Sequence, residues 1–323
     1  MRFEKWQALG NDYVIVEERE LPFELTPERV RRMCEPHTGI GSDGVLLLSP
    51  TDGRDAVARL RIFNPDGSEA ELSGNGAREA AMYLRHGGWT DRDEFTIDTA
   101  SGEIRPRVTG PDTCAMAIGR ARLTSKDFPS GAGDGRGRLE AAGRELEFQH
   151  VSVGNPQCAI EAPEGLEGLD LGELGPPIEH HELFPNRTNV SFWRRDSDHE
   201  ITDDEELEAL DLEALGPAVE GHELFPNRTN VSFWRRTGPG EIRARIFERG
   251  VGETLSSGTG ASGAAFAAVL GGAEPPVTVR LDGGELEVDV AENLEIELTG
   301  WAVPVYQGEL TPELVEHLEA VAA

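Results

Sequence analysis

Ser73-Gly74-Asn75-Gly76-Ala77-Arg78-Glu79-Ala80-Ala81 is the stretch that decides the fold, because it has a counterpart later in the chain. The counterpart is Ser257-Gly258-Thr259-Gly260-Ala261-Ser262-Gly263-Ala264-Ala265, and both read Ser-Gly-x-Gly-Ala-x-x-Ala-Ala. Each predicts a glycine turn that opens a helix of small residues. Since each half of the 323-residue chain contributes one copy, the pair predicts two related halves, and the length suffices for two cores.

The chemistry of these two turns favours an anionic ligand. A glycine turn at a helix start leaves backbone N–H groups pointing outward, and the helix dipole strengthens their attraction for a negative charge. Two such starts facing each other would hold one carboxylate from both sides. Acid–base groups at positions 73 and 257 would then flank the α-carbon, the arrangement that two-base racemisation requires. The alternative is that Ser73 and Ser257 are ordinary helix N-caps.

A second, longer repeat lies in the C-terminal half. Residues 169–195 recur at 210–236, and the last fifteen residues of each copy are identical, at 181–195 and 222–236. The spacing of 41 residues is within the range of solenoid repeats, but two copies do not make a solenoid. We interpret the repeat as a local duplication or an artefact of sequence assembly, and we expect one copy to be surplus to the fold.

Alternating strands and helices are expected between these landmarks. A strand within 2–17 is expected to run into a turn at Gly10-Asn11-Asp12, and residues 94–99 and 103–108 are expected to form a hairpin. A Gly-rich surface loop is expected at 129–137, near the domain boundary. The remaining predicted strands are 45–48, 57–63, 144–153, 158–161, 242–247, 277–281, 285–290 and 294–298. The predicted helices are 26–34, 75–86 and 311–321, with Thr26 and Thr311 as N-caps.

The charge of the chain limits its partners. Asp and Glu number 60 against 30 Lys and Arg, a net charge of −30, so we exclude nucleic acid and anionic membranes. Because the acidic residues are spread among apolar segments, we expect a folded halophilic protein rather than a disordered one, a merely acidic mesophilic protein being the alternative.

The hydropathy and the cysteines of the chain lead to two further expectations. The chain has no apolar run long enough to span a membrane and no signal-peptide pattern at its start, so we expect a cytoplasmic protein. Its three cysteines have no metal-ligand spacing, so we expect reduced thiols and no metal site.

Further polar residues at predicted turns and strand ends are candidate ligand contacts. They are Asn11, Asn64, Asn155, and one of Asn189 or Asn230. Glu248 and Arg249 follow a predicted strand, and such a pair could bind the ammonium and carboxylate of an amino acid. The alternatives are turn residues for the asparagines and a surface ion pair for Glu248 and Arg249.

Taken together, these motifs resemble the diaminopimelate epimerase family, and the set covers nearly the whole chain. In order they are Gly10-Asn11-Asp12-Tyr13, Gly39-Ile40-Gly41-Ser42-Asp43-Gly44, Asn64-Pro65-Asp66-Gly67-Ser68, Gly74-Asn75-Gly76-Ala77-Arg78, Gly154-Asn155-Pro156, the repeated Asn-Arg-Thr-Asn, Glu248-Arg249-Gly250-Val251-Gly252-Glu253-Thr254, and Gly258-Thr259-Gly260.

The resemblance implies an α/β (α+β) fold with two pseudo-symmetric domains, each a mostly antiparallel sheet wrapped around a central helix. It implies an N-terminal half of residues 1–115 with about 303–323, and a C-terminal half of 116–302. It also implies a C-terminal strand at 302–308 that returns to the first domain. The implied reaction interconverts LL- and meso-2,6-diaminopimelate, for lysine biosynthesis, in a cleft between the domains and without a cofactor. A homodimer is plausible from the family.

Carried over residue by residue, the resemblance assigns the two catalytic positions to Ser73 and Ser257. The turns Gly74-Asn75 and Gly258-Thr259 would hold the α-carboxylate. The other substrate contacts would be Asn11, Asn64, Asn155, Asn230, Glu248 and Arg249. We choose Asn230 over Asn189 because Asn230 directly precedes the strand that leads to Glu248.

Three positions depart from the family pattern. Cysteines are expected where Ser73 and Ser257 stand, and a histidine where Gln157 stands. A thiol, with a pKa of about 8.5, ionises at neutral pH far more readily than a serine hydroxyl. Deliberate replacement of both thiols, a divergent homologue with weak activity, and a relative that binds an amino acid without turnover all fit the serines. Another isomerase of the same scaffold is a further alternative.

Overall fold

The computed structural model describes residues 1–51, 55–70, 73–124, 133–141, 144–153, 155–161, 182–183, 189–193, 231–248 and 252–321, in part by the backbone alone. The chain divides into two compact units. Unit 1 comprises Met1–Ala117 and Thr299–Ala323, and unit 2 comprises Ile118–Leu298. Because the boundary falls within two strands, β9 (Thr113–Arg120) and β19 (Glu295–Trp301), these strands contribute residues to both units.

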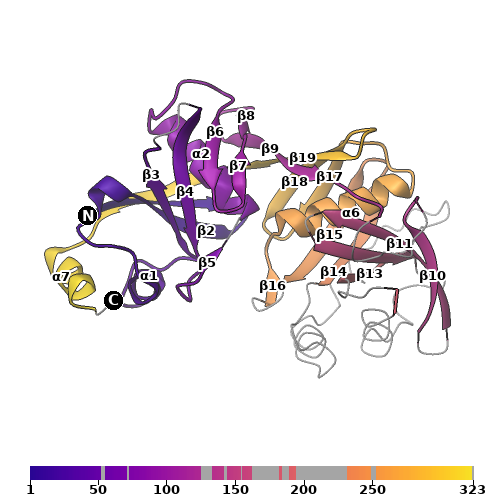
Figure 1. The fold of residues 1–323 in the computed structure, drawn as a ribbon, viewed down its shortest axis with the longest axis horizontal. Coiled ribbons are helices and arrows are strands. Elements are labelled where there is room, and N and C mark those ends of the chain that lie inside the picture. The colour runs from indigo at the N-terminus through magenta and orange to yellow at the C-terminus, as the bar shows by residue number, and fades with distance from the viewer. Residues whose placement is uncertain are drawn as a thin grey trace. The chain divides into compact units, whose positions relative to one another are not determined.

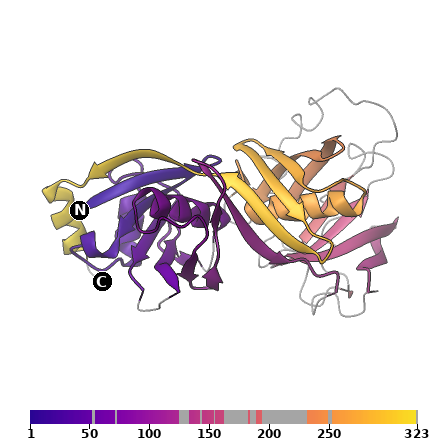
Figure 2. The ribbon, with the colours of Figure 1, turned by 90° about the horizontal axis from the view of Figure 1, so that it is seen from above.

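Unit 1 is built on one mostly antiparallel sheet with the strand order β20-β1-β2-β3-β4-β6-β7, and β5 pairs with β4. The C-terminal strand expected at 302–308 is β20, which pairs antiparallel with β1 and runs alongside it (Figure 2). The elements of unit 1 are β1 (Arg2–Ala8), β2 (Asn11–Glu17), η1 (Glu18–Glu20), α1 (Pro27–Cys34), β3 (Val45–Ser49), β4 (Ala56–Phe63), β5 (Glu69–Ala70), α2 (Gly74–His86), β6 (Thr96–Thr99), β7 (Gly102–Ile104), β20 (Val303–Glu309) and α7 (Pro312–Ala320).

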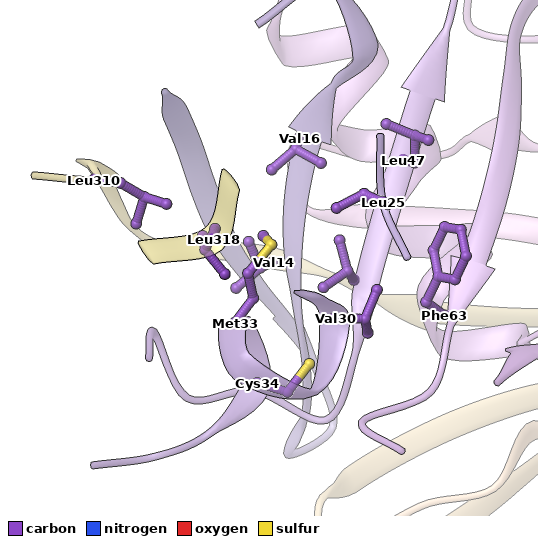
Figure 3. Packing of buried hydrophobic residues seen from close by; sticks show 11 residues of the cluster. Val14, Val16, Leu25, Val30, Met33, Cys34, Leu47, Phe63, Leu310 and Leu318 are labelled. Atoms are coloured by element: carbon purple, nitrogen blue, oxygen red, sulfur yellow. The ribbon is translucent and has the colours of Figure 1, made fainter. Parts of the chain in front are cut away.

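One face of this sheet is covered by α1 and α7 (Figure 1). Thr26 caps α1 by accepting a hydrogen bond from Arg29 N, and Thr311 caps α7 in the same way. Figure 3 shows Val30 and Met33 of α1 among the strand residues of this core. The buried cluster consists of Val14, Val16, Leu25, Val30, Met33, Cys34, Val45, Leu47, Phe63, Leu310 and Leu318.

The helix expected at 75–86 is α2, and it packs against β1, β2, β3 and β20. Its small residues Ala77, Ala80 and Ala81 are fully buried, which allows the helix to lie close to the strands. A helix of small residues therefore forms the centre of unit 1, as the first Ser-Gly-x-Gly stretch predicts.

Unit 2 contains the corresponding helix, α6 (Gly258–Leu270), and strands that fall into two sheets. One sheet has the order β10-β11-β12-β13, and the other has the order β14-β15-β17-β18-β19-β9-β8, with β16 paired to β15. The strands are β10 (Arg136–Ala141), β11 (Arg144–Val153), β12 (Asn155–Glu161), β13 (Asn189–Trp193), β14 (Val231–Gly238), β15 (Glu241–Glu248), β16 (Gly252–Thr254), β17 (Val277–Leu281) and β18 (Gly284–Val290), besides β9 and β19. The end strand β8 (Arg107–Val108) pairs with β9, but its residues belong to unit 1.

The helix α6 packs against strands of both sheets of unit 2, namely β11 from the first and β14, β15, β17 and β18 from the second. Figure 2 shows it lying along the strands of this unit. The two copies of the long repeat each supply a strand, β13 from the first copy and β14 from the second. That one copy is surplus to the fold stays a prediction.

Several expected elements have different bounds. The hairpin predicted at 94–99 and 103–108 is wrong in its second strand, because β7 pairs with β6 only as far as Ile104 and β8 pairs with β9. Pro106 lies between β7 and β8 and has no N–H to continue the ladder. The loop expected at 129–137 is also too long, since β10 begins at Arg136.

The remaining differences are small. The turn after β1 is Leu9-Gly10, both with positive φ, and Asn11 already belongs to β2. Of the three cysteines, Cys34 and Cys114 are buried. Among the described residues, the structure has no helix long and apolar enough to cross a membrane.

Candidate active site

Ser73 is the N-cap of α2, as the alternative interpretation of this residue predicts. Its backbone is extended, and its Oγ accepts a hydrogen bond of 3.1 Å from the backbone N–H of Gly76. A Cβ at Gly76 would lie 3.1 Å from Leu46 Cδ2, so the glycine lets this turn lie close to β3. The cap role fixes the Ser73 hydroxyl at the positive end of the helix, where an anion or a developing negative charge is stabilised.

A second hydrogen bond reaches the same hydroxyl from β2. Tyr13 is buried, and its Oη donates to Ser73 Oγ at 3.2 Å. A serine hydroxyl accepts two hydrogen bonds and donates one. Because Tyr13 and Gly76 fill the two accepting positions, the Ser73 proton is left to be donated to a third group. This pairing places the phenol of Tyr13, an ionisable group, in direct contact with the first candidate catalytic position.

The amides of Asn11 and Asn75 belong to one hydrogen-bond network in unit 1. Asn75 Nδ2 donates to Asn11 Oδ1 at 3.3 Å, and Asn11 Nδ2 donates to Asp43 Oδ2 at 2.9 Å. Asp43 Oδ2 also accepts from the backbone N–H of Asp12 at 3.0 Å, and Lys5 forms an ion pair with Asp12. The predicted contacts Asn11, Gly74 and Asn75 therefore lie together at the start of α2, with Ser73.

Two ionisable side chains of α2, Arg78 and Glu79, are fully buried. Arg78 donates to Asn75 Oδ1, which orients that amide, and burial lowers the pKa of Arg78 to about 10. Burial raises the pKa of Glu79 well above its ordinary value, against the opposing charge of Arg78. Arg78 therefore stays charged at neutral pH, whereas burial favours the protonated form of Glu79.

Asn64 lies at the end of β4 and is held within its own turn. Its Nδ2 donates to Ser68 Oγ at 2.9 Å, and its backbone bonds with Ser68 and Gly67 close the turn. The structure does not connect Asn64 by a hydrogen bond to Asn11, Ser73 or Asn75 among the described residues. Its part in a site stays a prediction.

In unit 2, Ser257 has the same cap geometry as Ser73. Its Oγ accepts from the backbone N–H of Gly260 at 3.3 Å, and its side chain is buried. Gly258 and Thr259 begin α6, and Ser262 Oγ donates back to the carbonyl of Gly258 at 2.8 Å. Both Ser-Gly-x-Gly stretches therefore form N-capped helix starts with N–H groups available to an anion.

The other predicted residues of unit 2 are placed by the backbone or lie outside the described residues. Asn155 begins β12, Asn189 begins β13, and Glu248 ends β15. Gln157 of β12 is the register partner of Asn189. Asn230 and Arg249 lie outside the described residues, so the choice of Asn230 is untested. Among the described residues, no cluster of His, Cys, Asp or Glu could hold a metal ion.

Comparison with known proteins identifies the family. A family model described as diaminopimelate epimerase matches residues 3–124 and 197–305. A diaminopimelate epimerase of Synechococcus sp. (strain JA-3-3Ab) is 36% identical over 320 residues, covering 95% of this chain and 97% of the relative. The chain belongs to the diaminopimelate epimerase family. A second member, from Desulfitobacterium hafniense, is 34% identical over 321 residues, covering 96% of this chain and 98% of the relative.

Solved structures agree with this family at the level of the fold. A methylitaconate-delta-isomerase superposes with a TM-score of 0.58 at 13% identity, covering 96% of this chain and 95% of that one. A hydroxyproline epimerase from Agrobacterium vitis superposes with a TM-score of 0.54 at 16% identity, covering 95% and 91%. The two-domain α/β fold expected for the diaminopimelate epimerase family is therefore confirmed.

Four residues around Ser73 and Asn75 were not among the predicted site residues: Tyr13, Asp43, Arg78 and Glu79. The first three lie inside the motifs that carry the family resemblance, so their positions were visible in the sequence. Their roles were not, because a tyrosine or aspartate in a strand or loop has no periodic signal that reveals its partner. Only the folded unit brings Tyr13, sixty residues away, to Ser73.

Proposed function

We propose that this chain is a diaminopimelate epimerase that interconverts LL- and meso-2,6-diaminopimelate for lysine biosynthesis. Relatives of that name align with the chain over nearly its whole length. The observation that carries the chemistry is the pair of helix starts, each with a serine hydroxyl held at its N-terminus by the same cap hydrogen bond. In this proposal Ser73 and Ser257 act on opposite faces of one α-carbon.

At the first position, the proton route supported by the geometry is from Tyr13 through Ser73 to the α-carbon. Ser73 donates its proton to the carbanion and receives the Tyr13 proton along the existing 3.2 Å hydrogen bond, which leaves a phenolate. In the reverse direction the phenolate recovers that proton through Ser73. Tyr13 thus supplies the ionisable group that a serine lacks and that a cysteine would provide itself.

At the second position, Glu248 is the candidate base, acting on the α-proton directly or through Ser257. A positioned carboxylate is a common general base and can accept such a proton. The substrate contacts in this proposal are Asn11, Asn64, Gly74, Asn75, Asn155, Asn230, Arg249, Gly258 and Thr259. Arg249 would pair with a substrate carboxylate, and the N–H groups at Gly74-Asn75 and Gly258-Thr259 would bind the α-carboxylate.

We also propose that the reaction needs no cofactor, since side chains alone perform both proton transfers, and that the enzyme works in a cytoplasm of high salt. The net charge of −30 supports the second point, because dense negative charge is tolerated best where ions screen it. A homodimer is consistent with the family.

The test is an isotope-exchange assay. LL-Diaminopimelate is incubated with the protein in deuterated buffer at high salt, and the α-proton is followed by NMR. Deuterium at the α-carbon together with the meso isomer is expected. Deuterium without inversion would mean that one position alone exchanges protons. Absence of exchange, with saturable binding measured by calorimetry, would contradict the proposed turnover and leave a protein that only binds the amino acid.

A matched variant isolates the acid–base groups. Replacing both Ser73→Cys and Ser257→Cys is expected to raise the rate by about 100-fold or more, because positioned acid–base groups of suitable pKa contribute that much. The control is Ser42→Cys, a serine of unit 1 that bonds to the Gly44 carbonyl and Cys34 rather than to Tyr13. A double variant that binds diaminopimelate without a gain in rate would count against the two-group mechanism.

A further inference from the structure

The strand ladders of the two units follow the same sequence of pairings. In unit 1, β1 and β2 are antiparallel, β2 and β3 parallel, β3 and β4 antiparallel, β4 and β6 parallel, and β6 and β7 antiparallel. In unit 2 the same alternation runs through β11, β12, β13 and then β14, β15, β17, β18. The difference is that β3 pairs on both sides, whereas its counterpart in unit 2 is divided between β13 and β14.

The registers agree with this correspondence. In unit 1, Val45 of β3 pairs with Val14 on one side and with Phe63 on the other. In unit 2, Val190 of β13 pairs with Cys158, and Val231 of β14 pairs with Phe247. Val190 and Val231 are the same residue of the two identical copies, 41 positions apart.

The short hairpins before the two helices show that these positions correspond. Phe63 pairs with Glu69 ahead of Ser73, and Phe247 pairs with Glu253 ahead of Ser257. The separation between corresponding residues is 184 in each case. β14 therefore has the register that β3 has toward β4. β13 has the register that β3 has toward β2, because Val14 and Cys158 are each the fourth residue of their strands, β2 and β12.

We infer that β13 and β14, one from each copy of the duplicated segment, share the position that a single strand would occupy in unit 2. A single copy can therefore pair with β12 and β15 together without a change of register. Two further observations support this inference. The copies have the same sequence across the strand, so either copy offers the same side chains. The two strands contact each other, and α6 packs against strands of both sheets, as α2 packs against one continuous sheet.

The division affects the proposed substrate site. In the protein with one copy, a single asparagine precedes the valine of the shared strand. It would be the register partner of Gln157 of β12 on one side and of Glu248 of β15 on the other, so that the three residues form one row across three strands. The first pairing is present at Asn189, and the second follows from the pairing of Val231 with Phe247. The corresponding row of unit 1 contains Tyr13, which bonds to Ser73. The part of the inference that concerns ligand rests on the proposed function.

The experiment is deletion of residues 190–230. Deletion of 196–236 gives the same protein, because the two copies are identical where the junction falls. The residues that connect β12 to the strand and the hairpin from the strand to β15 both remain. We expect cooperative urea unfolding with an unchanged or higher midpoint, and amide protection on β12 and β15 at least equal to that of the full chain. We expect meso-diaminopimelate to bind about tenfold tighter, since one charge-assisted contact is worth roughly that factor.

The possible outcomes separate the strand inference from the proposed function. Loss of cooperative unfolding, or faster amide exchange on β12 and β15, would overturn the single strand position. Retained folding with equal affinity for diaminopimelate in both proteins would contradict the claim that the row of Gln157, the asparagine and Glu248 improves binding. Retained folding with no binding by either protein would overturn the proposed function while the strand inference stands.

A second set of variants tests the inference in the full chain. Proline removes the N–H that a ladder needs, so Ser191→Pro disables the first copy and Ser232→Pro the second. Interchangeable copies predict a small shift of the urea midpoint for either single variant and loss of the cooperative transition for the double variant. If either single variant unfolds as readily as the double variant, both copies are required and the inference is wrong.

Discussion

Tyr13 lies on β2, far from α2 in the sequence, yet its hydroxyl donates to Ser73. We expect Tyr13→Phe to slow deuterium exchange at the α-carbon by about 100-fold, because it removes a positioned acid–base group. Tyr83→Phe is the matched control, since Tyr83 donates to Glu17 instead. The affinity for diaminopimelate should stay within about twofold in both variants. Equal exchange rates in the two variants would show that Tyr13 has no part in the proton route.

The burial of Glu79 leads to a separate prediction, which concerns stability rather than rate. Since burial raises the pKa of this carboxyl in the folded state, the folded protein binds a proton that the unfolded chain has released above about pH 4.3. Stability contributed by protonated Glu79 is therefore present below that pH and is lost as pH rises toward the raised pKa. Glu79→Gln should remove this loss, gaining about 1.4 kcal/mol for each pH unit in that window.

The measurement is urea unfolding of Glu79→Gln and the parent protein at intervals between pH 4.5 and 8. The difference in the free energy of unfolding should grow with pH until the raised pKa is reached. Glu292→Gln, at an exposed residue, is the control and should show no such trend. A difference that stays constant across the range would mean that Glu79 does not titrate differently in the two states.

Local residue chemistry allowed part of the site to be predicted from the sequence. The two Ser-Gly-x-Gly turns are local features, and the structure forms both as N-capped helix starts. The contacts of Tyr13 and Asp43 with Ser73 and Asn11 depend on tertiary pairing of β2 with β3 and α2, which no local pattern encodes. Prediction of residue roles therefore stopped where the partners are far apart in the chain.

At the scale of elements, the absence of a side chain at Gly44 allows Tyr13 of β2 to pack close to the start of β3. A Cβ at this residue would lie 2.6 Å from Cε1 of the Tyr13 ring and would also meet the carbonyl oxygen of Phe63. Gly44→Ala should therefore displace Tyr13 from Ser73 and cost about 1–3 kcal/mol of stability, as overpacking does. Deuterium exchange should slow as in Tyr13→Phe, because both changes break the same hydrogen bond.

Urea unfolding and the exchange assay measure the two effects of Gly44→Ala. Gly133→Ala is the matched control, because a Cβ there meets no atom within 4 Å. If Gly44→Ala leaves both stability and exchange unchanged, the added methyl group is accommodated without displacing Tyr13 and the prediction is wrong.

Helix starts were the most predictable elements, because a cap residue acts within its own turn. Thr26 and Thr311 cap α1 and α7 as expected. The strand expected at 103–108 failed because its apolar pattern continues through Pro106 while the ladder cannot. The division of one strand between β13 and β14 was also beyond prediction, since two identical sequences have identical propensities and only the fold assigns their partners.

At the scale of the whole molecule, the excess of acidic residues must be tolerated within each folded unit. On β18 the exposed residues alternate as Glu285, Glu287 and Asp289. Arg280 of the neighbouring strand β17 pairs with Glu285, but the β17 residue opposite Glu287 is Thr278. Like charges at Glu287 and Asp289 therefore repel on one face, and salt should weaken that repulsion because the screening length falls from about 10 Å at 0.1 M to about 3 Å at 1 M.

We expect the melting temperature of the protein to rise by about 10 °C between 0.1 and 2 M KCl, which corresponds to several kcal/mol for a chain of this size. Salt also strengthens apolar burial, so a charge-specific comparison is needed. The combined variant Glu287→Gln and Asp289→Asn removes two charges and keeps the shape of the strand. It should melt about 1–2 °C above the parent at 0.1 M KCl and at the same temperature at 2 M. If the difference in melting temperature between variant and parent persists at 2 M KCl, the higher stability of the variant comes from packing rather than from charge. If the melting temperature of the parent does not change with salt, the halophilic interpretation of its composition is contradicted.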